Sequence, residues 1–354
     1  MRVFVLPVSG GAFPIQLGFI SELTDINVIP DLVMGSSGGN VAAYVSLAAN
    51  WESSKIPEIT SKINHRLFVS SWWPRYLTFM PSWIIGYFKG SMYDSGSGIE
   101  KVFASLFNDE TITKTEIWTG TLNRDHGKGQ FFCNRSKSNS VIQPLAYTLP
   151  TIDSLQLTYM DGNIDLITKV SVASASIPVL VPEQIINDQH YVDGGMIFSS
   201  PFTALHDNLN SITDICHIDY INSYDIQNSN RSSYDNIYEN STLTINELIT
   251  SLCVSDRLSA INMLRYYNKP LYFVSLIGNQ DNLKLIENFR KSIKRSVLEF
   301  YPSISIKHLD LSSFEPDDIV KIITEARNNY SLRFWWTCDN DHHSSIFPQV
   351  VKLT

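Results

Sequence analysis

The stretch VMGSSGGNVAAYVSLAAN, residues 33–50, places five small residues between a strand-like apolar segment and an alanine-rich helical pattern. A direct joint between a strand and a helix is typical of α/β proteins. Within this joint, Ser37 has Gly35 two residues before it and Gly39 two residues after it, which is G-x-S-x-G spacing. Two interpretations are open here: a tight turn, or a nucleophilic serine held at a sharp strand-to-helix elbow.

A second strand–loop–helix unit lies directly before this stretch. The apolar run RVFVLPV, residues 2–8, is typical of a buried strand, and residues 9–23 continue as a glycine-rich loop that runs into a helical pattern. Two such units within about 50 residues predict parallel winding, because a helix carries the chain back between parallel strands. We therefore expect a three-layer α/β/α fold with a mostly parallel central sheet.

Later segments supply further elements of this fold. KTEIWTGTL and QFFCNRS, at residues 114–122 and 130–136, predict a strand pair, and residues 183–195 predict a hairpin around Asn187–Asp188. Residues 165–176 predict a helix that is rich in small side chains. The remaining candidates are strands at residues 212–221, 269–278 and 303–311 and an amphipathic helix at residues 317–338.

We expect a single domain spanning residues 1–354. The motifs that indicate a function fall within residues 1–205, and the C-terminal extension at residues 206–354 carries no motif that indicates its role. The polar run at residues 222–243 predicts a surface loop. Strand patterns on both sides of that loop favour the continuation of one sheet over a domain boundary.

Composition and charge are those of a globular protein that does not bind nucleic acid. The chain is 44% hydrophobic and 18% charged with a net charge of −8, whereas phosphate binding needs a surplus of Lys and Arg. The four cysteines are widely spaced without a C-x-x-C pair, which favours free thiols in a reducing compartment. The N-terminal apolar run is too short for a signal peptide, and no uninterrupted apolar run reaches about 18 residues. We expect a soluble, cytoplasmic protein whose contacts with membranes are at most peripheral.

The loop SGGA, residues 9–12, also joins a strand to a helix. Consecutive glycines at Gly10 and Gly11 can turn their N–H groups toward a substrate without obstruction by side chains, as an oxyanion-binding loop requires. A phosphate-binding loop and a simple turn remain alternatives for this stretch. The G-x-G-x-x-G spacing of dinucleotide-binding loops and the Gly-Lys-Ser of a Walker loop are both absent from it.

A third candidate, YVDGGM at residues 191–196, places Asp193 at the end of a predicted strand. Gly194 and Gly195 follow it and permit close packing against a neighbouring loop. An Asp-Gly-Gly sequence by itself is usually a turn. It gains meaning in combination with Ser37, because a carboxylate within hydrogen-bond reach of a serine can accept the serine proton.

In this order, the glycine loop, the G-x-S-x-G serine and the Asp-Gly-Gly aspartate resemble the patatin-like phospholipase family. The resemblance covers about residues 1–205 and includes the segment SVASASIPVLVPEQIINDQHYVDGG, residues 171–195. It implies a patatin-like α/β/α fold and the hydrolysis of acyl esters in lipids or phospholipids. It implies no metal and no organic cofactor.

The same resemblance implies roles for individual residues. Ser37 is expected to be the nucleophile and Asp193 the base of a Ser–Asp dyad. Gly10, Gly11 and the N–H of Gly38 are expected to donate to the oxyanion. The helix that starts behind the serine adds the positive end of its dipole, which favours a developing negative charge.

The glycine loop departs from the family pattern at one place. The family loop continues with Arg or Lys and a further glycine, whereas this chain continues with Phe13 and Pro14. A catalytically silent lipid-binding or regulatory relative is therefore an alternative to an active hydrolase. A second alternative is an α/β-hydrolase esterase in which a late histidine, His342 or His343, serves as the base.

An aromatic stretch at residues 67–88 bears on the substrate. It contains Trp72, Trp73 and Trp83, and two prolines and an arginine interrupt it, so it does not predict a membrane-spanning helix. One interpretation is a pair of core helices. The other is an interfacial or lid element whose indole rings lie at headgroup depth and admit acyl chains to Ser37.

Overall fold

The computed structural model describes most of the segments on which the motifs lie. The described residues are 1–9, 13–25, 27–63, 97–108, 110–141, 156–178, 181–198, 201, 217–221, 271–276, 324, 330–336 and 349–351. The predicted surface loop at residues 222–243 and the strand candidate at residues 303–311 lie outside them.

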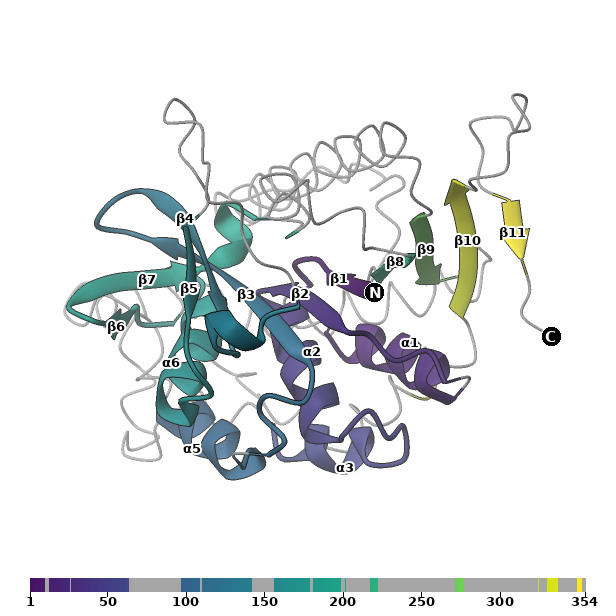
Figure 1. The fold of residues 1–354 in the computed structure, drawn as a ribbon, viewed down its shortest axis with the longest axis horizontal. Coiled ribbons are helices and arrows are strands. Elements are labelled where there is room, and N and C mark those ends of the chain that lie inside the picture. Colours follow the sequence, from purple (N-terminus) through teal and green to yellow (C-terminus); the bar gives the residue numbers. More distant parts are fainter. Residues whose placement is uncertain are drawn as a thin grey trace, which may run out of the picture.

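A single large sheet organises the molecule (Figure 1). Its strands are β1 (Arg2–Leu6), β2 (Leu32–Ser36), β3 (Glu116–Asn123), β4 (Lys128–Cys133), β5 (Gln156–Tyr159), β6 (Gln184–Ile186), β7 (Gln189–Asp193), β8 (His217–Ile221), β9 (Leu271–Leu276), β10 (Tyr330–Trp336) and β11 (Gln349–Val351). The strand order is β11-β10-β9-β8-β1-β2-β3-β4-β5, and β7 pairs with β3 and β6 beside this path. The neighbouring strands from β9 to β3 are all parallel, which confirms the predicted parallel centre.

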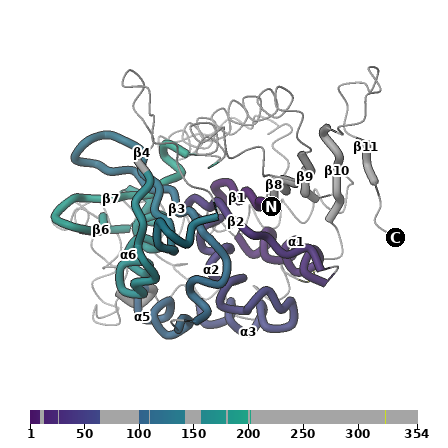
Figure 2. The backbone as a smooth tube through the Cα atoms, in the orientation of Figure 1, coloured from purple at the N-terminus to yellow at the C-terminus, as the bar shows by residue number. Residues whose placement is uncertain are grey.

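Helices flank this sheet as one continuous layer. They are α1 (Phe13–Asp25), α2 (Gly38–Ala48), α3 (Ile56–Ser61), α5 (Ser97–Leu106) and α6 (Ile164–Ser174). Helix α2 contacts α1, α3 and α6, and α6 contacts α5, so these helices cover one side of the sheet (Figures 1 and 2). The fold is therefore mixed α/β. The helices named here belong to this one layer, and the second helix layer stays a prediction.

The first two strands form as predicted because their sequences are almost wholly apolar. All of β2 and all but the first residue of β1 are buried, as expected for central parallel strands that are covered on both faces. The core between β1, β2 and the helices includes Phe4, Val33, Phe19 and Tyr44, each fully buried. This core holds the β2–α2 joint rigidly at the carboxyl end of β2.

Two hairpins extend the sheet where the sequence predicts them. Strands β3 and β4 pair as antiparallel neighbours, and β6 and β7 pair around a turn at Asn187–Asp188, both residues having positive φ. Strand β7 then pairs with β3, with Asp193 opposite Thr121. Because β3 also pairs with β2, this arrangement brings the end of β7 close to the end of β2.

The C-terminal part of the chain adds strands to the same sheet. Strand β8 pairs with β1 and strand β9 with β8, and both lie within predicted strands. The helix expected at residues 317–338 is wrong in its second half, because β10 occupies Tyr330–Trp336. The backbone of β10 pairs with β9 on one side and with β11 on the other. The Tyr, Phe and Trp residues of β10 are types that favour strands.

Two expectations from composition can be compared with the described residues. Cys133 carries a free, buried thiol whose pKa is raised by burial, whereas Cys216, Cys253 and Cys338 lie outside the described residues. Among the described residues, no helix is both long and apolar enough to cross a membrane.

Candidate active site

Ser37 stands at a strained elbow between β2 and α2. Its backbone has φ 54° and ψ −127°, and a positive φ is uncommon for a residue with a side chain. The adjacent helix start lies so close to β1 that a Cβ on Gly39 would be 2.3 Å from the Leu6 carbonyl oxygen. Only glycine fits there, so this glycine of the G-x-S-x-G motif is required by the close approach of two backbones. Gly35, the other motif glycine, lies within β2 and pairs with Thr119 of β3.

The elbow brings the Ser37 side chain to Asp193. Ser37 Oγ donates a hydrogen bond of 2.8 Å to Asp193 Oδ2, and the two residues are only 2% and 3% exposed. The β2–β3–β7 pairing produces this contact, since Ser36 at the end of β2 pairs with Gly120 and Asp193 at the end of β7 pairs with the next residue of β3, Thr121. Sequence motifs alone point to Ser37 and Asp193, and the structure places the two side chains in contact.

The groups that surround Asp193, and its burial, determine the pKa of its carboxyl group. Its Oδ1 accepts a hydrogen bond of 2.6 Å from the Gly195 N–H, in the short 3-10 helix Gly194–Met196 that follows β7. Burial raises the pKa of Asp193 to about 7, although the hydrogen bonds from Ser37 and Gly195 act in the opposite direction. A carboxylate with a pKa near neutrality can both take up and release a proton at physiological pH.

Gly194 fits against β3 in a space that leaves no room for a side chain. A Cβ on Gly194 would lie 2.0 Å from the Gly120 carbonyl oxygen. The glycine therefore lets the chain turn away from β3 directly after Asp193. The chain therefore turns at Asp-Gly-Gly, and this turn holds the Asp193 carboxylate in position.

The start of α2 offers backbone donors next to Ser37. Gly38 is the first residue of α2, and the first N–H groups of a helix have no acceptor within that helix. This end also carries the positive end of the helix dipole, which favours an anion. Gly10 and Gly11, the other expected donors, lie outside the described residues. The preceding residue, Ser9, is buried at 6% exposure.

Ser174 is a neighbour of the pair that sequence reasoning missed. It is the last residue of α6, and its Oγ accepts a hydrogen bond of 3.1 Å from the Ser37 N–H. The same hydroxyl donates a hydrogen bond of 2.7 Å to the Gly120 carbonyl. The sequence marks it only as one serine among several in a small-residue helix, so no local signal separates it from Ser171 or Ser176.

His190 and His126 contact other residues than Ser37 and Asp193. His190 lies on β7, but its Nδ1 lies 3.0 Å from Asp125 Oδ1 on the β3–β4 turn, and its side chain is about two-fifths exposed. His126 lies on the same turn and contacts Gln189. The late histidines His342 and His343 lie outside the described residues. Trp72, Trp73 and Trp83 lie outside them as well.

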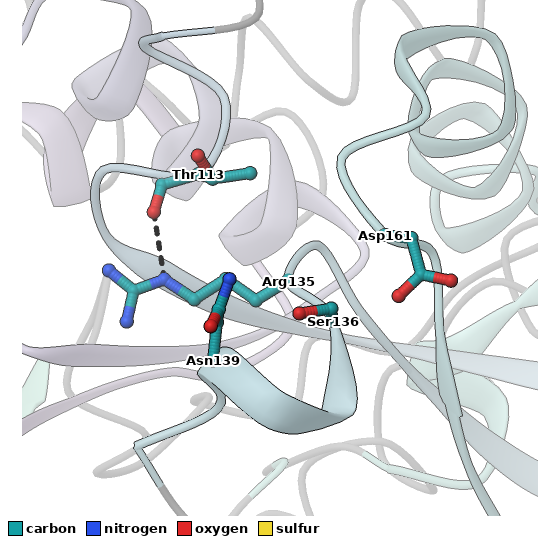
Figure 3. A pocket seen from close by; sticks show the side chains of 5 residues that line it. All are labelled: Thr113, Arg135, Ser136, Asn139 and Asp161. Carbon is teal, nitrogen blue, oxygen red and sulfur yellow. Dashed lines mark hydrogen bonds between the residues drawn. The ribbon is translucent and has the colours of Figure 1, made fainter.

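A polar pocket of about 380 Å³ lies at the other end of β3 (Figure 3). Its lining residues are Thr113, Arg135, Ser136, Asn139 and Asp161. Arg135 donates from Nε to the Thr113 carbonyl at 2.8 Å and from a terminal nitrogen to the Lys114 carbonyl at 2.6 Å. The guanidinium thus secures the loop that leads into β3. Within the described part of the chain, no group of three or more His, Cys, Asp or Glu side chains could hold a metal ion.

Comparison with known proteins identifies one family. A family model described as patatin-like phospholipase matches residues 8–206, which is more than half of the chain. The matched segment contains Ser37, Asp193 and Ser174. No curated protein matches the sequence.

Proposed function

Because the chain belongs to the patatin-like phospholipase family, we propose that it hydrolyses acyl esters of lipids with Ser37 as nucleophile and Asp193 as base. The observation that carries this proposal is the hydrogen bond of 2.8 Å from Ser37 Oγ to Asp193 Oδ2. A serine hydroxyl is a weak nucleophile unless an adjacent base takes its proton. In this site the adjacent base is a buried carboxylate.

The first half of the reaction forms an acyl-enzyme. Ser37 Oγ attacks the ester carbonyl carbon while its proton passes to Asp193, and the carbonyl oxygen becomes an oxyanion. The N–H of Gly38, together with Gly10 and Gly11, donates to that oxyanion. Removing one such donor from an acyl-transfer site costs about 2.7–4 kcal/mol of transition-state stabilisation. Collapse of the intermediate breaks the ester bond, and Asp193 returns the proton to the leaving alcohol.

The second half of the reaction restores the enzyme. Asp193 accepts a proton from a water molecule as that water attacks the acyl group on Ser37. The second tetrahedral intermediate collapses to a free fatty acid, and Ser37 Oγ regains its proton from Asp193. The strained elbow supports both steps, because it places Oγ beyond the end of β2, beside Asp193, instead of within a strand.

We further propose that the lipid substrate is reached through peripheral contact with a membrane, in which Trp72, Trp73 and Trp83 take part. Indole rings favour the membrane interface, where one edge is apolar and the N–H remains hydrated. The net charge of −8 gives no bulk attraction to anionic lipid, so the contact depends on apolar side chains.

A fluorophosphonate probe tests the proposed chemistry, because it phosphonylates an activated serine. The wild-type protein should be labelled, and Ser37→Ala should not. Ser36→Ala is a matched control: Ser36 is adjacent in sequence and fully buried, and among the described residues its hydroxyl has no hydrogen-bond partner. Ser36→Ala should therefore retain labelling. A wild-type protein that binds lipid vesicles yet resists the probe would instead support the catalytically silent relative.

A further inference from the structure

We propose that Ser174 is a positioning residue for the nucleophile, and that the C-terminal end of α6 sets the geometry between Ser37 and Asp193. The inference rests on the proposed function of that pair. It assigns no contact with substrate to Ser174. Its role is to hold the backbone from which the nucleophile projects.

The Ser174 hydroxyl joins the end of α6 to both the elbow and β3, next to the point where Ser36 of β2 pairs with Gly120 of β3. Its proton is committed to the Gly120 carbonyl of β3 at 2.7 Å, and its lone pair accepts the Ser37 N–H at 3.1 Å. Ser174 itself is fully buried. The hydroxyl therefore ties the elbow to the central sheet through one donor and one acceptor, with no solvent available to replace either.

The Ser37 N–H needs such a partner because of where the elbow places it. Strand β2 ends at Ser36 and α2 begins at Gly38. The Ser37 carbonyl accepts from the Asn40 and Val41 N–H groups at the start of α2, but the Ser37 N–H finds its acceptor in neither element. A buried N–H without an acceptor is costly, and most such groups in native proteins are paired. The hydrogen bond to Ser174 therefore stabilises the positive φ that directs Ser37 Oγ toward Asp193.

The same helix end also holds the base. The Asp193 N–H donates a hydrogen bond of 3.0 Å to the Ser176 carbonyl, two residues beyond Ser174. One short segment, residues 174–176, thus binds the backbone of both Ser37 and Asp193. Gly120 joins this arrangement, because the carbonyl that accepts from Ser174 is also the one against which Gly194 packs.

The other buried serines of α6 and its end behave differently. Ser171 donates to the Ile167 carbonyl at 2.7 Å, and Ser176 donates to the Val172 carbonyl at 2.8 Å, each four residues earlier in the chain. Such bonds to the preceding turn are the usual local arrangement for serine in a helix. Ser174 departs from it and donates to β3, which is a tertiary contact. Ser171 is therefore a matched control for Ser174.

The test compares Ser174→Ala with Ser171→Ala by the rate of fluorophosphonate labelling and by ester hydrolysis. An unsatisfied Ser37 N–H should lower kcat and the maximal labelling rate by about tenfold to a hundredfold, with KM changed by less than about twofold. Ser171→Ala should have the labelling rate and the hydrolysis rate of the wild type. Ser174→Thr restores a hydroxyl and should recover most of the lost rate.

A second readout does not depend on activity. Amide hydrogen exchange of the peptide that contains Ser37 should accelerate in Ser174→Ala and stay unchanged in Ser171→Ala. If the wild type itself is not labelled, the proposed function fails, and the exchange measurement still decides the positioning role. If Ser174→Ala does not fold, Ser174→Cys replaces it, because a thiol is nearly isosteric with the hydroxyl but a weak hydrogen-bonding group.

The outcomes are distinct. Slower labelling together with faster exchange at the elbow, in Ser174→Ala or Ser174→Cys alone, supports the proposal. The proposal is overturned if Ser174→Ala has the same labelling rate and the same amide exchange rate as Ser171→Ala. A loss in Ser174→Ala that appears only in KM also overturns it, because a positioning role for the nucleophile acts on the chemical step.

Discussion

Ser37 Oγ lies 2.8 Å from Asp193 Oδ2, although 156 residues separate the two in the chain. The contact is buried, and it depends on two strand pairings, β2 with β3 and β3 with β7. The two residues come from separate supersecondary units, a strand–helix joint and a hairpin. Their geometry is consequently fixed by the sheet, which is a more rigid support than a loop.

Replacing the proposed base with its amide should abolish most of the activity. Asp193→Asn keeps the shape of the side chain but cannot accept the serine proton, and we expect the labelling rate to fall about 100-fold or more. Thermal unfolding should show that the variant is folded. Asp165→Asn serves as the control, because Asp165 is an exposed partner of Lys169 on α6. A wild-type rate in Asp193→Asn would assign the base to another residue, with His342 and His343 the first to test.

Activity should rise with pH through the pKa of Asp193. Only the ionised carboxylate can accept a proton, and the pKa of this group is raised to about 7 by burial. The labelling rate of the wild type should therefore increase between about pH 6 and pH 8, with its midpoint near 7. A rate that is already constant at pH 5 would contradict this environment for the carboxylate.

The same raised pKa predicts a pH dependence of stability. The folded state binds the Asp193 proton more tightly than the unfolded state, since the pKa rises from 3.8 to about 7 on folding. The stabilisation is complete below the unfolded pKa and is lost as the pH rises through about 7. The Tm of Asp193→Asn should thus exceed that of the wild type at pH 8 and approach it at acidic pH. An equal pH dependence of Tm in Asp193→Asn and the wild type would contradict the raised pKa of Asp193.

Adding a methyl group at Gly194 should disrupt both packing and activity. The new Cβ would lie 2.0 Å from the Gly120 carbonyl oxygen, so either β3 or the segment after Asp193 must move. We expect Gly194→Ala to lower the free energy of unfolding by about 1–3 kcal/mol and to slow labelling strongly. Gly127→Ala is the control: its Cβ would meet nothing within 4 Å, and its strain at φ 63° is local to a turn. Gly127→Ala should keep the wild-type labelling rate even where its Tm falls.

Removing two indole rings should weaken the proposed contact with membranes. We expect Trp72→Ala combined with Trp73→Ala to reduce the fraction of protein bound to phosphatidylcholine vesicles several-fold, because apolar area at the interface is lost. Labelling by a water-soluble fluorophosphonate and the Tm should stay close to wild type. Unchanged vesicle binding in this variant would instead favour the core-helix interpretation of the aromatic stretch.

The sequence alone predicted those parts of the fold that local patterns encode. The apolar runs of β1 and β2, the small residues between β2 and α2, and the turn at Asn187–Asp188 each determine a structure within a few residues. The expectation failed at Tyr330–Trp336, where a helical period continued across a segment that forms β10. The segment itself carries strand signals, because Tyr330, Leu332 and Phe334 alternate with polar residues, and pairing with β9 and β11 realises them.

For the candidate site, the sequence by itself determined which side chains we propose as the catalytic pair. The motif glycines and Asp-Gly-Gly mark Ser37 and Asp193, because close backbone approach restricts certain positions to glycine whatever the distant surroundings are. Only the tertiary structure decided that these two residues touch, that burial raises the pKa of the carboxylate, and that Ser174 joins the elbow to β3. Each of these depends on segments that are far apart in the chain and meet through sheet pairing. Distances, desolvation and hydrogen-bond partners arise only once the strands are assembled.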